Sequence, residues 1–299
     1  MNFDLSDDQV ALRDGIRNLV EGRFHSTRIR DGFDRSVFDE LAGAGVFSLR
    51  ADGFGWADAA IVFEELGRAA VPGPLVWSFL AQGTTDGITG GLDAGPTILV
   101  EHPDTIDSLV VLTSESVRHV ARGELVLEEV EWPLDPLTPV ARVATLPAGD
   151  VLSHDVHDWR RGGAVLTSAF LVGLAQRATE LAVDHASTRE QFGRVIGSFQ
   201  AVKHLCADMT VRTELARVAT HSAAVHLDDP VLSAAERAVA GAKVLAGEAA
   251  TRNGLSATQI FGGMGFTWEV DVHLLLKRAW VLDTQFGTID AHAWALGGA

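Results

Sequence analysis

The sequence predicts a mainly α-helical fold with one small β domain, arranged in three consecutive parts. Apolar residues recur at helical spacing over residues 1–88 and again over 153–299. Between them, residues 89–152 carry short runs rich in β-branched residues, separated by Pro, Gly and Asp. With 299 residues, 47% of them hydrophobic, the chain can bury a large core. We therefore predict an N-terminal helical domain (1–88), a shortened antiparallel β domain (89–152) and a C-terminal four-helix bundle (153–299).

The first domain is expected to consist of helices. Ser6 and Gln9 have the spacing of a capping box, which indicates the start of the first helix. Further helices are expected over about 36–44 and 58–67, the second with its first aspartate as the N-cap. The prolines of 72–74 must then lie outside a helix interior, because proline there removes a hydrogen bond and clashes with the preceding turn.

Strands are expected in the middle part, where β-rich runs stand between turn residues. The expected strands cover 97–101, 108–113, 124–131 and 140–144.

Three long helices and two shorter ones are expected in the last part. The first runs roughly over 155–187 and is apolar on most faces, so we expect it at the centre of a bundle. Asp155 and Asp158 stand at its start as candidate N-cap residues. The third long helix is expected to open with Asp229–Pro230, a cap followed by proline at the first helical position. The helices after the first are expected over about 198–226, 229–259, 270–282 and 288–296.

Composition excludes several classes of protein. A formal net charge of −16 argues against nucleic-acid binding, which needs a basic surface. Cys206 is the single cysteine, so neither a disulfide framework nor a thiolate metal cluster is expected. His154 and His157 alternate with two aspartates, but without further ligands we predict no metal site. We find no basic leader followed by an apolar segment and no apolar stretch of membrane-spanning length, and so expect a cytoplasmic protein.

Two segments at the ends of long apolar helices combine polar side chains with glycines. One is Ser187–Gly193 (STREQFG) and the other is Gln259–Phe266 (QIFGGMGF). Glycine permits close approach of a backbone, and arginine suits contact with phosphate. From the residues alone, a second interpretation stays open, in which Arg189 and Gln191 form a surface salt bridge and a cap while the glycines end a helix.

Together these segments resemble the paired FAD-contacting segments of the acyl-CoA dehydrogenase family. Four further segments are similar to that family, namely 38–46, 63–72, 134–136 and 140–143. The resemblance covers nearly the whole chain and implies the acyl-CoA dehydrogenase fold, with FAD bound across a subunit interface.

The resemblance also implies which residues contact the cofactor. Arg189 matches the arginine on the flavin diphosphate, and Phe192 matches an aromatic ring against the adenosine end. Gln259 belongs to a loop that approaches the adenine half from a neighbouring subunit. The full set of implied FAD contacts is Arg189, Gln191, Phe192, Phe199, Gln200, Gln259, Gly262, Gly263 and Thr288.

The chain departs from the family at the catalytic base. One family position for the glutamate holds Phe286 and the other holds Gly163, and neither side chain accepts a proton. Removing an α-proton from an acyl thioester needs a base within roughly 3 Å. Asp283 and Asp290 are the nearest substitutes, although solvated structural carboxylates are the commoner case. The β domain also lacks the threonine-, glycine- and serine-bearing loop that holds the isoalloxazine ring in the family.

The hypothesis that follows is an FAD-dependent acyl-CoA dehydrogenase in which this chain is the shortened, non-catalytic subunit of an α2β2 heterotetramer. The resemblance implies a full-length acyl-CoA dehydrogenase subunit as partner, an acyl-CoA substrate that by analogy is lipid- or steroid-derived, and an electron-transfer acceptor. Two alternatives stay open. One is a self-sufficient acyl-CoA dehydrogenase with a non-standard base, and the other is a flavin-free helical scaffold or binding protein.

Overall fold

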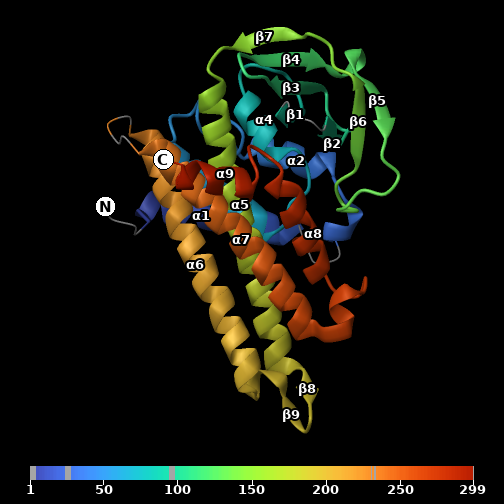
Figure 1. Ribbon diagram of the computed structural model, residues 1–299, viewed down its shortest axis with the longest axis vertical. Helices are drawn as coiled ribbons and strands as arrows, with labels where there is room; N and C mark the ends of the chain where they lie inside the picture. The colour runs from blue at the N-terminus through green and yellow to red at the C-terminus, as the bar shows by residue number, and fades with distance from the viewer. Residues whose placement is uncertain (1–4, 24–27, 94–97, 230, 232–233, 299) are drawn as a thin grey trace.

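Three long helices of the C-terminal part set the long axis of the molecule (Figure 1). They are α5 (Val156–Thr188), α6 (Gln200–Asp228) and α7 (Ala235–Phe261). The computed structural model describes residues 5–23, 28–93, 98–229, 231 and 234–298. The larger sheets lie at one end of these helices, and a small hairpin lies at the other (Figure 1). The hairpin pairs β8 (Glu190–Gln191) with β9 (Arg194–Val195).

The described N-terminal part is helical, as predicted. It contains α1 (Asp7–Arg23), the 3₁₀ helix η1 (Arg28–Asp31), α2 (Arg35–Gly43), α3 (Trp56–Arg68) and α4 (Leu75–Ala81). The capping box is confirmed, because Gln9 N donates to Ser6 Oγ (3.2 Å) and Ser6 N donates to Gln9 Oε1 (3.1 Å).

The prediction that Asp58 is the N-cap of α3 is wrong. The helix begins at Trp56, and the Asp58 carboxylate accepts from the N–H of Gly55 (2.9 Å). A carboxylate from another helix explains the earlier start: Asp228 at the end of α6 accepts from Trp56 N (2.7 Å) and Ala57 N (2.9 Å). Those amides would otherwise lack partners at a helix N-terminus.

Helix α4 was not expected, because the prolines of 72–74 end the preceding helical pattern. It begins directly after Pro74, and all but one of its seven residues are buried. A short helix that is apolar on every face shows no helical periodicity, so its sequence cannot be distinguished from that of a buried strand. Its Trp77 becomes important at the site.

The β domain consists of two sheets. One has the strand order β1-β3-β4-β7 and the other β2-β6-β5. The predicted strands correspond to β2 (Leu99–Glu101), β3 (Ser108–Leu112), β5 (Val126–Glu129) and β6 (Val140–Thr145), with Thr97 outside the described residues. The strands not expected are β1 (Thr89–Asp93), β4 (Val117–Ala121) and β7 (Asp150–Ser153), and a 3₁₀ helix, η2 (Arg122–Glu124), follows β4. One pair departs from the antiparallel pattern, since β1 and β3 run parallel.

The C-terminal bundle packs α5, α6 and α7 together with α8 (Val272–Asp283), and the chain closes with α9 (Ile289–Gly297). Two more 3₁₀ helices lead into α6 and out of α7, η3 (Ile196–Ser198) and η4 (Gly262–Phe266). Asp155 is the N-cap of α5, accepting from Asp158 N at 3.0 Å, so Asp158 lies inside the helix instead.

The start predicted for the third long helix is wrong. Helix α7 begins at Ala235, and Pro230 lies outside the described residues. The Asp229 carboxylate accepts from the N–H of Val231 (3.0 Å). That bond closes a local turn before the helix, a common use of aspartate.

A buried amide fixes the bundle's three long helices against one another. Asn253 of α7 donates to Thr213 Oγ1 (2.9 Å) and Met209 O (3.0 Å) on α6 and to Thr179 Oγ1 (3.2 Å) on α5. Because an unpaired buried polar group is unfavourable, this network favours one register of the helices.

Neither a membrane-crossing helix nor a metal-ligating cluster is found in the part of the chain that the structure describes. None of its helices is long and apolar enough to span a bilayer. Likewise, no group of three or more His, Cys, Asp or Glu residues is arranged to hold a metal ion among these residues.

Candidate functional site

The β8–β9 hairpin, where α5 ends, exposes an aromatic side chain on a strained turn. Phe192 and Gly193 form the turn, with φ values of 54° and 77°. The left-handed conformation is unfavourable for a residue with a side chain and is typical of Asn or Gly in such turns. Phe192 is nevertheless 92% exposed, so burial of its ring within the chain does not offset the strain. Strain of this kind often marks a functional position.

An aromatic and a cationic side chain support the hairpin. The Phe199 ring packs edge-on against the Phe192 ring, with centroids 6.1 Å apart. On Phe199 also lies the Arg194 guanidinium, 4.1 Å from the ring centroid. Such cation–π contact holds a positive charge near the exposed ring. Gln200 follows as the first residue of α6 and is exposed.

The surface salt bridge of Arg189, which belongs to the second interpretation left open by the sequence, is not formed among the described residues. Arg189 ends α5 through its backbone, with its N–H donating to His185 O (2.8 Å), and its exposed side chain makes no salt bridge within the described ranges. Gln191 donates from Nε2 to the Glu190 carbonyl (2.7 Å). Burial and the Arg189 charge lower the pKa of His185, so its imidazole is neutral near pH 7 and adds no charge here.

A ring stack brings the second predicted segment beside the hairpin. His185 in the last turn of α5 stacks on Phe261 at the end of α7, with centroids 4.0 Å apart and planes at 14°. Gln259, Gly262 and Gly263 therefore lie near this end of α5, and all three are exposed. Gly262 has φ 65°, and around both glycines the space where a Cβ would stand is open. A flat ligand can approach the backbone closely here.

Thr288 belongs to a different place. Its Oγ1 accepts from Ala291 N (3.1 Å) as the N-cap of α9. The neighbouring Phe286 packs on Gly163, near the start of α5. Arg189 follows Gly163 by 26 residues along the same helix, a distance of about 39 Å at 1.5 Å per residue. The structure thus brings eight of the nine predicted residues to one end of α5 and separates Thr288 from them.

The residues at the two family positions for the base, Gly163 and Phe286, pack against each other. A Cβ on Gly163 would lie 2.2 Å from Phe286 Cε1. Trp77 of α4 covers the other side of Phe286, with ring centroids 4.3 Å apart. A Cβ on Gly91 of β1 would in turn lie 1.8 Å from Trp77 Cδ2. Glycine at 91 and at 163 thus makes room for an aromatic plug, which we define as Trp77 and Phe286.

The two carboxylates considered as substitute bases, Asp283 and Asp290, have structural roles at the start of α9. Asp283 Oδ1 accepts from Ile289 N (2.9 Å), which closes the loop between α8 and α9. Asp290 is exposed in the first turn of α9, where a carboxylate interacts favourably with the helix dipole. Neither arrangement holds a carboxylate against the plug.

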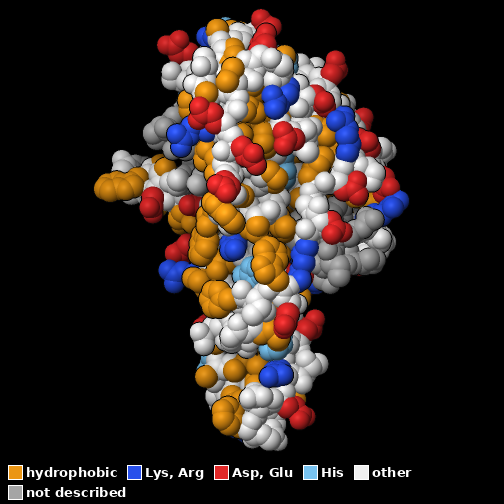
Figure 2. Space-filling model, turned by 90° about the vertical axis from the view of Figure 1, so that its right-hand side faces the viewer, with side chains coloured by type: hydrophobic (Ala, Val, Ile, Leu, Met, Phe, Trp, Pro, Cys, Tyr) orange, Lys and Arg blue, Asp and Glu red, His pale blue; other side chains and the backbone are white. Residues whose placement is uncertain are grey.

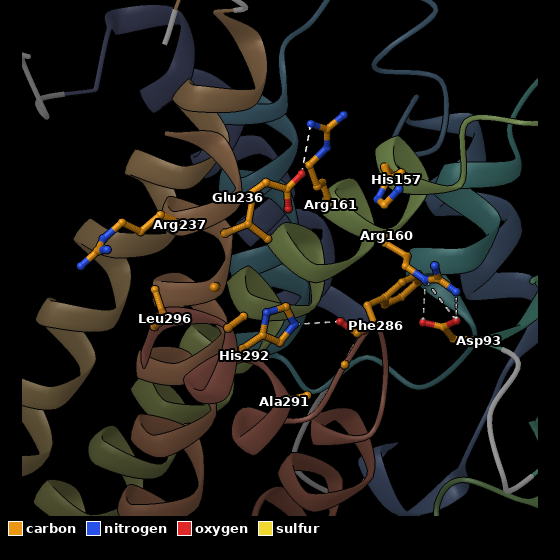
Figure 3. Close-up of a pocket in the computed structure, with 14 residues that line it drawn as sticks. Asp93, His157, Arg160, Arg161, Glu236, Arg237, Phe286, Ala291, His292 and Leu296 are labelled. Atoms are coloured by element: carbon orange, nitrogen blue, oxygen red, sulfur yellow. Dashed lines mark hydrogen bonds and ion pairs between the residues drawn. The ribbon is translucent and has the colours of Figure 1, made fainter. Parts of the chain in front are cut away.

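A cavity of about 490 Å³ opens on the outer side of Phe286 (Figure 3). Residues from the N-terminal halves of α5 and α7 and from α9 border it. Arg160, Arg161 and Arg237 add cationic side chains, of which Arg160 pairs with Asp93 (2.7 Å) and Arg161 with Glu236 (3.4 Å). The plug ends this cavity on its inner side.

The buried Lys243 and the partly buried His292 hold the plug's loop, residues 283–287. Lys243 donates to three of its carbonyl oxygens, and His292 Nε2 lies 2.9 Å from the carbonyl oxygen of Phe286. Since a carbonyl oxygen only accepts, Nε2 carries the proton. Burial lowers the pKa of His292, so the neutral tautomer is favoured.

Sequence reasoning missed Arg194, His185, Trp77 and Lys243. One signal was available for Lys243, because it is one of three lysines in the chain and stands within the apolar run Ala240–Ala246. A lone charged residue on a buried helix usually has a specific partner. The stack of His185 on Phe261 and the position of Trp77 depend on tertiary packing and carry no local signal.

Comparison with known proteins agrees with this architecture. Residues 161–296 match the family model for the acyl-CoA dehydrogenase C-terminal domain. The acyl-CoA dehydrogenase IpdE2 of Mycobacterium tuberculosis (strain ATCC 25618 / H37Rv) is 32% identical, over 91% of this chain and 91% of that protein. The chain therefore belongs to the acyl-CoA dehydrogenase family, a family of oxidoreductases.

Solved structures share the fold along the whole chain. A variant of the Tcur3481–Tcur3483 steroid ACAD superposes with a TM-score of 0.83 at 21% identity, covering 98% of this chain and 97% of that chain. The ChsE4–ChsE5 complex from Mycobacterium tuberculosis gives a TM-score of 0.81 at 21% identity, covering 100% and 98%.

Proposed function

We propose that this chain is the non-catalytic subunit of a heteromeric acyl-CoA dehydrogenase and completes the FAD site of a full-length partner subunit. Domain limits of 1–88, 89–152 and 153–299, a cytoplasmic location and an α2β2 assembly belong to the proposal. It is supported by the ChsE4–ChsE5 complex, a fold relative made of two different chains.

The packing of Phe286 on Gly163 is the observation that carries the proposal. Desaturation of an acyl thioester transfers an α-proton to a carboxylate and a hydride from the β-carbon to the bound flavin. Here the Phe286 ring occupies the space that a side chain at 163 would need, and Trp77 packs on the same ring. The proton-abstracting group must then come from the partner.

The exposed end of α5 fits the nucleotide half of FAD. Arg189 offers a guanidinium without a salt-bridge partner in the described part of the chain, as a diphosphate contact needs. Phe192 offers an open ring face for the adenosine end, and the open backbone at Gly262 admits a flat base. In this proposal the remaining contacts come from Gln191, Phe199, Gln200, Gln259 and Gly263, and Thr288, at the other end, contacts no flavin held there.

An apolar surface beside this end fits a partner subunit. Phe266 and Trp268 are 74% and 56% exposed, and Trp280 of α8 is 39% exposed. Figure 2 shows apolar side chains gathered over the middle of one face, between scattered charged ones. Exposed aromatic side chains are typical of protein interfaces. The substrate class we propose is an acyl-CoA thioester, steroid-derived by similarity to the steroid ACAD, with a separate electron acceptor.

Co-expression with a full-length acyl-CoA dehydrogenase encoded nearby tests the proposal. The purified complex is expected to contain one flavin for two chains, and turnover is expected to disappear when the partner's glutamate is replaced by glutamine. In the same complex Arg189→Gln should lower flavin content, whereas the matched change Arg252→Gln at an exposed site of α7 should not. One tightly bound flavin and turnover in each isolated chain would overturn the proposal.

One buried carboxyl gives a specific observation for a second candidate, a self-sufficient enzyme. Burial raises the pKa of Glu101, and Gln285 Nε2 donates to its Oε1 (2.7 Å). Glu101 and Trp77 both border a small cavity of about 20 Å³ on the inner side of the plug. Unchanged turnover in Glu101→Gln excludes this candidate, and loss of turnover by the isolated chain would favour it.

A further inference from the structure

Lys243, in the middle of α7, is fully buried. Its Nζ donates to the carbonyl oxygens of Asp283 (3.0 Å), Gln285 (2.8 Å) and Gly287 (2.6 Å). An ammonium group has three N–H donors, so each donor has one acceptor. A buried charge needs dipoles or opposite charges in place of water. The three carbonyl dipoles and the nearby Asp283 carboxylate supply them.

The loop of residues 283–287 is held from more than one side. Between the carbonyls that face Lys243, the carbonyl of Phe286 accepts from His292 Nε2 (2.9 Å; Figure 3). The side chain of Gln285 reaches the β domain, donating to Glu101 Oε1 (2.7 Å). The carbonyls of residues 283, 285 and 287 thus accept from Lys243, whereas that of residue 286 accepts from His292. These bonds restrain the orientation of the peptide groups along the loop.

Phe286 needs this restraint because its backbone is strained. Its φ of 53° lies in the left-handed region, which side chains disfavour and which persists only where the surroundings determine it. In this conformation the ring enters the space between Gly163 and Trp77. The position of the plug therefore depends on the hydrogen bonds of its loop.

We propose that Lys243 is a positioning and specificity-determining residue, whose buried ammonium organises the 283–287 loop and so keeps Phe286 closing the cavity against acyl chains. The inference concerns a residue and a gate that the proposed function does not include. It holds for this chain with or without flavin and partner.

A side chain without N–H groups at 243 leaves three part-buried carbonyls without their donors. Unpaired buried carbonyls are unfavourable, so the loop relaxes toward solvent and the strained conformation of Phe286 is lost. Withdrawal of the ring joins the cavity of about 490 Å³ to the space beside Gly163 and to the small cavity of about 20 Å³ next to Trp77. The inner end of this space is lined by Leu75, Val76, Phe170 and Leu282 beside the polar groups of Glu101, Arg278 and Gln285, and we expect it to admit an acyl chain.

Hydrogen exchange of the full chain tests the loop. Lys243→Met keeps the length of the side chain and removes its charge. It is expected to speed exchange of the loop amides, and of the Ile289 amide that donates to Asp283, by at least about tenfold, while α5 and α6 amides keep their rates. Lys203→Met, the same change at an exposed site of α6, should leave all rates unchanged. Equal acceleration in every helix, or none in the loop, would show that Lys243 does not position it.

Binding of a fluorescent fatty acid, 11-(dansylamino)undecanoate, tests the gate. Phe286→Ala is expected to bind this probe about tenfold more tightly than the unchanged chain, and Lys243→Met to gain part of that effect. The double variant should bind as Phe286→Ala does, because both changes act on one ring. Additive gains in the double variant, or no gain in either single variant, would contradict the proposal.

The unsubstituted chain provides a test that does not depend on variant folding. Selective ¹⁵N-lysine labelling gives signals from only three side chains, Lys203, Lys243 and Lys277. One ammonium signal is expected to exchange its protons with water at least about tenfold more slowly than the others, since its N–H groups are buried and bonded. Three equally fast signals would show that the three hydrogen bonds of Lys243 Nζ do not form.

Discussion

The two ends of α5 differ in the exposure of the aromatic side chain that lies beside each. At its far end Phe192 is 92% exposed on a strained turn, whereas near its start Phe286, also strained, is 3% exposed between Gly163 and Trp77. Strain at an exposed ring is offset only by a partner, and strain at a buried ring is offset by packing within the chain. In the function that we propose, the first end is completed by a ligand and a partner, whereas the second is filled by side chains of the chain itself.

The largest effect is expected from a glutamate at position 163, at the buried end. The Gly163→Glu Cβ would lie 2.2 Å from Phe286 Cε1. Overpacking together with a buried, unpaired carboxylate should lower the free energy of unfolding by about 4 kcal/mol. Gly241→Glu on α7, where no atom lies within 4 Å of a Cβ, is the matched control and should change it by less than about 1 kcal/mol. Urea unfolding checks both, and an unaffected Gly163→Glu would mean that the plug is loose.

The buried end also predicts a dependence of stability on alkaline pH. Burial lowers the pKa of Lys243 to about 8, against 10.5 ordinarily. Between these values the unfolded chain holds a proton that the folded chain has lost, so stability should rise with pH, by about 3 kcal/mol in total. Neutral Lys243 keeps only two N–H donors, so the protection of the loop amides, relative to the intrinsic exchange rate at each pH, should fall over the same window.

Urea unfolding from pH 7.5 to 10.5 measures this rise. The chain has no tyrosine and one cysteine, so few other groups titrate there. Burial raises the pKa of Cys206, so its titration makes stability fall as the pH rises. Measuring both proteins in a Cys206→Ser background removes this contribution. The rise should vanish in Lys243→Met, and its persistence there would assign it to another group.

The exposed end predicts opposite effects on stability and on flavin binding. Phe192→Asn places a residue that tolerates the left-handed turn, so the free energy of unfolding should increase by about 1 kcal/mol. Flavin affinity of the complex should fall about tenfold with loss of an aromatic face. Thermal unfolding of the chain and flavin titration of the complex check the pair. Stabilisation without loss of flavin affinity would show that Phe192 does not touch the cofactor.

The smallest effect is expected at Asp290. This exposed carboxylate lies in the first turn of α9, so Asp290→Asn should lower stability by about 0.5 kcal/mol through the helix dipole. Turnover of the complex should be unchanged. A large loss of turnover would make Asp290 a base and support the self-sufficient enzyme.

Local signals in the sequence predicted local structure well. The capping box at Ser6 and the cap at Asp155 depend on neighbouring residues, and both form as expected. The start of α3 was misplaced because its amides are capped by Asp228 of α6, a residue 172 positions from Trp56. Strand β1 was not expected because its sequence TGGLD is poor in β-formers, and its Gly91 instead makes room for Trp77.

The site was predictable only in part for the same reason. The residues at 163 and 286 could be singled out through family resemblance, but nothing in either segment shows that they pack on each other. Separation of Thr288 from Arg189 likewise follows from the unbroken length of α5, which neither segment shows by itself. Lys243 carried the only local signal for the loop.

The packing of Phe286 on Gly163 has an evolutionary consequence. A carboxylate restored at 163 meets a ring, and one restored at 286 faces the indole of Trp77 and a helix without a countercharge in contact with it. Each single reversal is therefore expected to be destabilising, and a proton-abstracting chain would need paired substitutions at 163 and 286. In the assembly that we propose, one mutation in this chain would thus not restore a base, and the chain would go on relying on its partner.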